Sequence, residues 1–229
     1  MDKKAFKAAF PLTMPVFAGY LVLGMGFGIL LSSKGYSFLW ALVMSLTIYG
    51  GSAQYVAVDL LSGGASLIST ALLTFMVNAR YLFYGVSMIE KYKHIGKIKP
   101  YLIFGLTDET YAIVATTDAP EGVDKKKFYF YTTILDQSYW VLGSVIGAIA
   151  GSTLAFNTEG VDFAMTALFV VIFIDQWLSH SDHRPAVIGL VSTIVCLVIF
   201  GAESFLIPSM IVISSALLVM RGRLEKGVD

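Results

Sequence analysis

A chain of 229 residues, of which 56% are hydrophobic and only 14% are charged, has too few charged side chains to cover a water-soluble globule. Sixteen Lys and Arg residues balance sixteen Asp and Glu residues, so no net basic field exists to attract a nucleic-acid backbone. The single cysteine, Cys196, excludes an internal disulfide and a cysteine-based metal centre. The composition therefore indicates a protein whose excess apolar surface faces lipid.

Apolar runs follow one another along the whole chain at lengths that suit a bilayer. A spanning helix needs about 20 apolar residues, because the hydrocarbon layer is about 30 Å thick. Six charge-free runs reach or approach this length: residues 11–33, 35–58, 60–79, 137–158, 185–202 and 204–220. Two more runs, 100–117 and 163–178, contain acidic residues. We therefore expect an all-α, polytopic integral membrane helix bundle with seven or eight transmembrane segments, in one domain over residues 1–229.

The N-terminal segment has three lysines before its first apolar run, as a signal peptide does. That run is longer than the core of a signal peptide, so we interpret it as the first span. Loops rich in Lys and Arg favour the cytoplasmic side. Their distribution puts the C-terminus in the cytoplasm in two arrangements: eight spans, or seven if residues 100–117 only dip into the bilayer. The two arrangements place the N-terminus on opposite sides.

Two stretches of the chain resemble each other. Residues 20–28 and 139–147 share a Tyr, a Val, a Leu and two glycines at equivalent positions, about half the chain apart. A duplication into halves of about 8–117 and 128–220 would suit a transporter whose substrate site lies between two repeats. The alternative is that glycines four residues apart recur wherever membrane helices pack backbone to backbone.

Two adjacent glycines, Gly50 and Gly51, lie inside the second run. Each weakens a helix by about 1 kcal/mol relative to Ala and permits a positive φ, which predicts a break in the helix. The half-helix that follows would point its positive end inward, with the Ser52 hydroxyl and the Gln54 amide available to a substrate carboxylate. The alternative is a packing notch in which Gln54 bonds to another helix.

An arginine, Arg80, follows Asn78 past the middle of its apolar segment. Ionisable residues are costly at membrane depth, so those present are candidates for function. Arg80 is either the counter-ion of a carboxylate or a residue that extends its side chain to the membrane surface. The sequence leaves both interpretations open.

Acidic residues supply the candidates for proton coupling. Asp108 and Glu109 point about 100° apart on a helix, unlike the paired acids of a hydrolase. A carboxyl group buried in a membrane can carry a proton, although both residues would be wet if they lie at a loop tip. Asp136 is explained as a helix-entry residue that stabilises the helix dipole. Asp175 has no such explanation and is the better candidate.

Enzymatic motifs are not visible in the chain. It contains no phosphate-binding loop, nucleophile elbow or zinc helix, and His180 and His183 lack a further ligand at zinc-type spacing. We therefore expect no enzyme activity, no cofactor and no metal site.

The polar clusters taken together resemble a known family. Pro15 and residues 50–55, 78–87 and 108–112 look like the AzlC family, the large subunit of bacterial branched-chain amino-acid exporters. The resemblance covers nearly the whole chain. It implies a permease of the bacterial cytoplasmic (inner) membrane that exports leucine, isoleucine, valine and sometimes methionine with the proton gradient. It also implies a small AzlD-type membrane subunit as partner.

We therefore expect a proton-coupled secondary transporter whose polar residues converge on one cavity in the bilayer. The predicted substrate-binding residues are Gly50, Gly51, Ser52, Gln54, Tyr55, Asn78, Arg80 and Tyr84. The predicted proton-coupling residues are Asp108, Glu109 and Asp175. Two other functions stay open, namely a non-transporting scaffold that binds the small subunit and a channel for small zwitterions.

Overall fold

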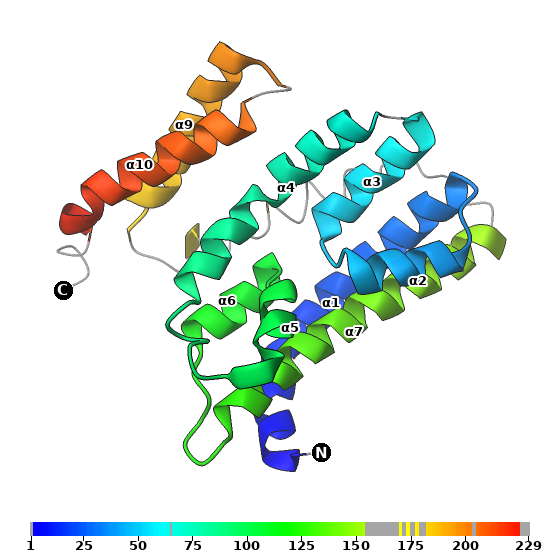
Figure 1. Cartoon of the computed structure of the whole chain (residues 1–229), viewed down its shortest axis with the longest axis horizontal. Coiled ribbons are helices and arrows are strands. Elements are labelled where there is room, and N and C mark those ends of the chain that lie inside the picture. Colours follow the sequence, from blue (N-terminus) through cyan, green and yellow to red (C-terminus); the bar gives the residue numbers. More distant parts are fainter. Residues whose placement is uncertain are drawn as a thin grey trace. The chain divides into compact units, whose positions relative to one another are not determined.

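The computed structural model of the chain describes residues 2–64, 66–153, 170, 173–174, 177–178, 182–202 and 205–224. The chain divides into two compact units, Met1–Met165 and Thr166–Asp229. Within the described ranges all regular secondary structure is helical, as predicted (Figure 1). The helices of the first unit are α1 (Lys3–Ser33), α2 (Phe38–Thr47), α3 (Gly51–Gly63), α4 (Leu67–Ser87), the 3-10 turn η1 (Gly96–Ile98), α5 (Lys99–Phe104), α6 (Asp108–Thr116) and α7 (Lys125–Thr153).

The two longest helices, α1 and α7, pack along each other and run in the same direction (Figure 1). Glycines line the contact. A Cβ on Gly143 would lie 2.8 Å from the carbonyl oxygens of Tyr20 and Leu21, and one on Gly147 would overlap the backbone of Met25. Backbones come this close only where the side chain is absent. The glycines of the two similar stretches therefore face each other, which supports the packing explanation, and the duplication stays a prediction.

The second apolar run is divided between α2 and α3, and the chain reverses direction between them (Figure 1). With 10 and 13 residues, the two helices are about 15 Å and about 20 Å long, so neither crosses a layer about 30 Å thick. The predicted break is confirmed, but the positive φ of 43° belongs to Tyr49 and not to a glycine. Gly50 is the extended N-cap of α3. Gly51 lets the Trp140 ring pack closely against α3, because a Cβ at this position would lie only 3.2 Å from that ring.

The third predicted run, residues 60–79, does not form one helix. Its first residues still belong to α3, which ends where Gly64 takes a left-handed conformation with φ 62°. Helix α4 begins only at Leu67 and continues past Arg80 to Ser87. The expectation was wrong because charge-free length was taken as the guide, whereas a glycine in the left-handed region ends a helix.

The run at residues 100–117 forms two short helices, α5 and α6, separated by residues 105–107. Helix α6 begins after Thr107, whose side-chain oxygen accepts a hydrogen bond from the Thr110 N–H. Helices of 6 and 9 residues are too short to span. This segment therefore does not cross a bilayer as one helix, which agrees with the arrangement in which it only dips in.

Helix α7 begins well before the predicted run at residues 137–158. Its first turn holds Lys126 and Lys127, whose N–H groups donate to the Asp124 carboxylate. Asp136 lies in the middle of the helix and is fully buried. Its interpretation as a helix-entry residue is therefore wrong, because a charged residue was taken as the boundary of an apolar run although the helix continues through it.

The second unit contains α9 (Arg184–Phe200) and α10 (Leu206–Leu224), which pack against each other. These helices lie where the runs at residues 185–202 and 204–220 predict them. A glycine, Gly201, follows α9 with φ 75° and ends it. Within this unit, the sequence pattern therefore predicts both described helices to within a few residues.

The number of membrane spans is not confirmed. Among the described residues, α1 is the one helix that is long and apolar enough to cross a membrane by length and composition. Shorter apolar helices are α2, α9 and residues 211–220 of α10. The expectation of seven or eight spans stays a prediction.

A hydrophobic cluster packs where α1 and α7 begin. It includes Ala9 of α1, Tyr92 of the segment after α4, Leu102 of α5 and Phe128 of α7, all fully buried. Side chains from four segments therefore meet at one end of the first unit. Farther along α1 lies a polar cluster, which is formed by side chains of α3, α4 and α6.

Candidate functional site

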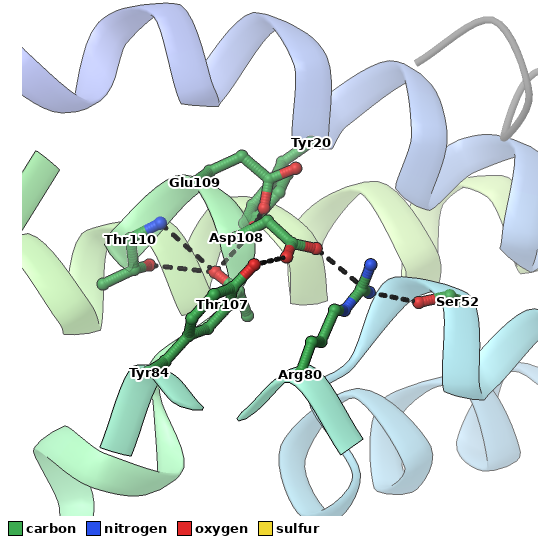
Figure 2. A network of polar contacts seen from close by, with 8 residues as sticks. All are labelled: Tyr20, Ser52, Arg80, Tyr84, Thr107, Asp108, Glu109 and Thr110. Atoms are coloured by element: carbon green, nitrogen blue, oxygen red, sulfur yellow. Dashed lines mark hydrogen bonds and ion pairs between the residues drawn. The ribbon is translucent and has the colours of Figure 1, made fainter. Parts of the chain in front are cut away.

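An ion pair joins the middle of α4 to the first turn of α6, and a hydrogen bond joins it to the first turn of α3 (Figure 2). The Arg80 Nη2 atom lies 3.0 Å from Asp108 Oδ2, and it donates a hydrogen bond of 2.5 Å to Ser52 Oγ. The side chains of Arg80 and Asp108 are 24% and 19% exposed, so the pair is neither on the surface nor sealed from it. Arg80 is the counter-ion of Asp108, one of the two roles that the sequence leaves open.

Both helix ends at this site are N-termini. The N-cap of α3 is Gly50, and no side chain caps that end. Helix α6 starts with the adjacent acids Asp108 and Glu109, where the positive end of the helix dipole stabilises negative charge. The arrangement offers positive charge and N–H donors from Arg80 and α3, and negative charge from α6. It can therefore bind a carboxylate and an ammonium group side by side.

A tyrosine holds the carboxylate of the ion pair in place. The Tyr84 hydroxyl donates a hydrogen bond of 2.6 Å to Asp108 Oδ1. Its ring stacks on that of Tyr111, with the ring centroids 4.2 Å apart and the planes 7° from parallel. Asp108 therefore has one oxygen on Arg80 and the other on Tyr84 (Figure 2).

Glu109 points away from its neighbour, toward α1. The Tyr20 hydroxyl lies 2.6 Å from Glu109 Oε2 and 2.6 Å from Thr107 Oγ1. The two acids thus have different surroundings, as their angular separation on a helix predicts. Asp108 faces a cation, whereas Glu109 faces hydroxyl groups (Figure 2).

Two predicted binding residues are engaged inside the helix packing. Gln54 is fully buried, donates to Ser45 Oγ at 3.1 Å and accepts from Trp140 Nε1 at 2.8 Å. The Tyr55 hydroxyl donates to the backbone oxygen of Leu23 at 2.9 Å. Both side chains hold α3 against neighbouring helices, which corresponds to the alternative considered for Gln54. Their direct contact with a substrate stays a prediction.

One other predicted residue, Asn78, is not brought to the ion pair. Asn78 and Arg80 are two positions apart on α4, so their side chains point about 200° apart. Asn78 lines a separate hollow of about 430 Å³ with Thr74, Phe75 and Leu82. Asp175 lies outside the described residues, and its role stays a prediction.

Sequence reasoning missed Asp136. Thr110 Oγ1 donates a hydrogen bond of 2.8 Å to Asp136 Oδ2, and Oδ1 is buried with no hydrogen-bond partner in the described part of the chain. A signal for this residue exists in the sequence, because small and polar residues recur at intervals of three or four along α7. The buried polar members are Thr132, Thr133, Asp136, Gln137 and Ser144. This periodicity marks a polar helix face directed into the protein.

The described residues hold no group of three or more His, Cys, Asp or Glu side chains that could bind a metal ion. The His183 ring stacks on Trp177, with centroids 4.1 Å apart. His180 lies outside the described residues. The polar cluster on α3, α4 and α6 thus remains the candidate site of the first unit.

Comparison with protein families gives a match that covers more than half of the chain. The family model described as AzlC protein matches residues 15–154, which include every described residue of the candidate site. No solved structure matches the chain.

Curated proteins of similar sequence are membrane proteins. The chain is 48% identical to the "Branched-chain amino acid transport protein AzlC" of Bacillus subtilis over 97% of its own length and 87% of that protein's. It is 42% identical to an "Uncharacterized membrane protein" of Haemophilus influenzae over 99% of this chain and 93% of that protein. A more distant relative is the "Inner membrane protein YgaZ" of Escherichia coli, 29% identical over 76% of this chain and 72% of that protein.

Proposed function

The chain belongs to the AzlC family, and from this membership we propose that it is a secondary transporter that exports branched-chain amino acids across the bacterial cytoplasmic membrane. Its relative in Bacillus subtilis is named as a branched-chain amino acid transport protein. The expected substrates are leucine, isoleucine and valine, with methionine as a further candidate. The single observation that carries the proposal is the partly exposed ion pair between Arg80 and Asp108.

The ion pair matches the charges of a free amino acid. A zwitterion needs one cationic and one anionic partner in a place that water does not fully screen. The guanidinium of Arg80 would bind the substrate carboxylate, with the Ser52 hydroxyl and the start of α3 beside it. Asp108 would bind the substrate ammonium group. In this structure the two residues neutralise each other.

Aromatic and small residues around the pair would form the rest of the site. Tyr84 holds Asp108 in position, and the absence of a side chain at Gly51 lets the Trp140 ring pack against the start of α3. Gln54 and Tyr55 would act by fixing α3 against its neighbours. An apolar substrate side chain gains free energy from such surroundings in proportion to the apolar area that it buries.

Coupling, direction and partnership complete the proposal. Asp108 or Glu109 would carry the coupling proton, because a carboxyl group buried in a membrane can exchange one. A small AzlD-type membrane subunit would act with the chain, and the C-terminus would lie in the cytoplasm. Asn78 and Asp175 are proposed as further contacts of the substrate and the proton.

The test uses cells that cleave a leucine-containing dipeptide and therefore accumulate leucine. Cells with the full chain and the small subunit should keep a lower cytoplasmic leucine level than cells without them. A scaffold would leave the level unchanged, and a channel would release leucine equally well in the presence of an uncoupler. Either result contradicts the proposal.

A matched pair of variants places the activity at the ion pair. Arg80→Ala should raise cytoplasmic leucine to the level of cells without the transporter. Arg184→Ala removes an arginine of the second unit whose ion pair with Asp182 is more exposed, and it should export normally. If Arg80→Ala exports like the wild type while present in the membrane, the proposed site is wrong.

A further inference from the structure

Two carboxyl groups lie behind the ion pair without a cation of their own. Asp136 of α7 is fully buried, and Glu109 is partly buried next to Asp108. In the described part of the chain, neither forms a salt bridge with Lys, Arg or His. Burying an ionised carboxyl group without a cation costs free energy of folding, so a purely structural role does not explain these two acids.

Hydroxyl groups connect these two acids without a gap. Tyr20 OH lies 2.6 Å from Glu109 Oε2 and 2.6 Å from Thr107 Oγ1. Thr107 Oγ1 lies 3.1 Å from Thr110 Oγ1, which lies 2.8 Å from Asp136 Oδ2. Figure 2 shows this chain as far as Thr110. All these distances are within hydrogen-bonding range.

The number of hydrogen atoms available to this row of hydrogen-bonded groups determines whether its two carboxyl groups can both be ionised. Four contacts join the five groups, and each hydroxyl group has one hydrogen atom to donate. Tyr20, Thr107 and Thr110 therefore supply donors for three contacts. The fourth hydrogen bond forms only if one of the two carboxyl groups carries a proton.

Two arrangements satisfy all four contacts. When Glu109 is protonated, every group donates toward Asp136; when Asp136 is protonated, every group donates toward Glu109. Passing from one to the other breaks four O–H bonds and forms four, so it moves one proton between the two acids with no other reactant. The titratable groups that face this chain are Asp108 and Arg80 beside Glu109, and Tyr49 and Tyr101 beside Asp136.

We propose that Glu109 and Asp136 share one proton through Tyr20, Thr107 and Thr110, and that Asp136 is the inner proton-carrying residue of the transport cycle. This inference rests on the proposed transport function. It assigns the coupling proton to a pair of acids behind the substrate ion pair, so that Asp108 is left to hold the substrate. The unpartnered Asp136 Oδ1 offers a position for a second proton.

The test compares two modes of transport in membrane vesicles that contain the full chain and the small subunit. Exchange of labelled for unlabelled leucine needs substrate binding and movement but no net proton transfer. Accumulation driven by a pH gradient needs both. Asp136→Asn should retain exchange and reduce gradient-driven accumulation to that of vesicles without the protein, whereas Asp136→Glu should restore part of it.

A second variant interrupts the hydrogen-bonded connection between Glu109 and Asp136 without changing either acid. Thr110→Val removes the hydroxyl that contacts Asp136 and should separate the two modes in the same way. The matched control is Thr132→Val, since Thr132 is equally buried but donates only to the backbone oxygen of Phe128. This control should leave both modes unchanged.

An infrared readout distinguishes a proton site from a structural role. The spectrum of the wild type should contain the C=O stretch of a protonated carboxyl group, which Asp136→Asn should remove. Gradient-driven accumulation by Asp136→Asn, or equal loss of both modes in folded Asp136→Asn and Thr110→Val, would overturn the inference. Absence of both modes in the wild type would instead overturn the proposed transport function.

Discussion

The contact between α1 and α7 and the meeting point of α3, α4 and α6 lie in the same unit but are built differently. Along α1 and α7, glycines let two backbones touch, so any added atom meets a backbone group that cannot move aside. At the meeting point, charged and hydroxyl side chains hold three helices together. A ligand can replace such side-chain contacts one by one. The first region is therefore expected to stay rigid during transport, and the second to rearrange.

The largest expected effect comes from filling the rigid contact. Gly147→Leu would place a side chain on the backbone of Met25 and should prevent folding. Gly19→Leu on α1 is the matched control, because a Cβ there meets nothing within 4 Å. The amount of monodisperse protein after detergent extraction measures the difference. Equal yields would show that the α1–α7 contact is not tight.

The next effect concerns the ion pair. Asp108→Asn removes one charge-assisted contact, worth about 1.5 to 3 kcal/mol, which predicts about a ten- to hundredfold rise in the KM for leucine. The matched control, Glu90→Gln, removes an exposed carboxylate that pairs with Lys93 and should leave KM unchanged. Transport measured over a range of leucine concentrations checks both. If Asp108→Asn leaves KM unchanged, the meeting point of α3, α4 and α6 does not bind the substrate through Asp108.

An intermediate effect is expected where the two regions join. Trp140→Phe removes the donor to Gln54 Oε1 and leaves a buried acceptor, at a cost of about 1 to 3 kcal/mol. Thermal unfolding in detergent should show a lower Tm, with KM for leucine unchanged. Trp40→Phe, at a ring that is 49% exposed, should change neither. A raised KM with normal Tm would instead indicate that Gln54 contacts the substrate, as first predicted.

The smallest effect is expected in the second unit, which is far in sequence from the α1–α7 contact and from the meeting point of α3, α4 and α6. The guanidinium of Arg184 lowers the pKa of Asp182 from 3.8 to about 2. A lowered pKa in the folded state stabilises the protein above the unfolded pKa, and this contribution disappears as the pH falls from 3.8 toward about 2. Asp182→Asn should therefore lower Tm slightly at pH 7 and by less at pH 2. Because the pair is exposed, a large change at pH 7 would be unexpected.

Local features of the fold were predictable from the sequence, whereas pairings between distant residues were not. Adjacent glycines predict the break before α3, since their effect on a helix is local. The contact between Arg80 and Asp108 joins residues far apart in the chain, and no local pattern distinguishes it from a side chain that reaches the membrane surface. Asp136 was misjudged because an apolar run was ended at its charge, although helix periodicity continues through it.

The shared direction of α1 and α7 has a consequence for the lysines of the first unit. Parallel helices in contact begin on the same side, and Lys127 at the start of α7 reaches Asp2 at 3.0 Å. The segment after α4 joins them there, because Lys91 and Lys125 both pair with Asp118. Five lysines thus lie at one edge, namely Lys3, Lys91, Lys125, Lys126 and Lys127. Lys and Arg favour the cytoplasmic side during insertion, so we propose that this edge of the first unit lies there, with α2–α3 and α5–α6 each entering the bilayer and returning to the side from which they came.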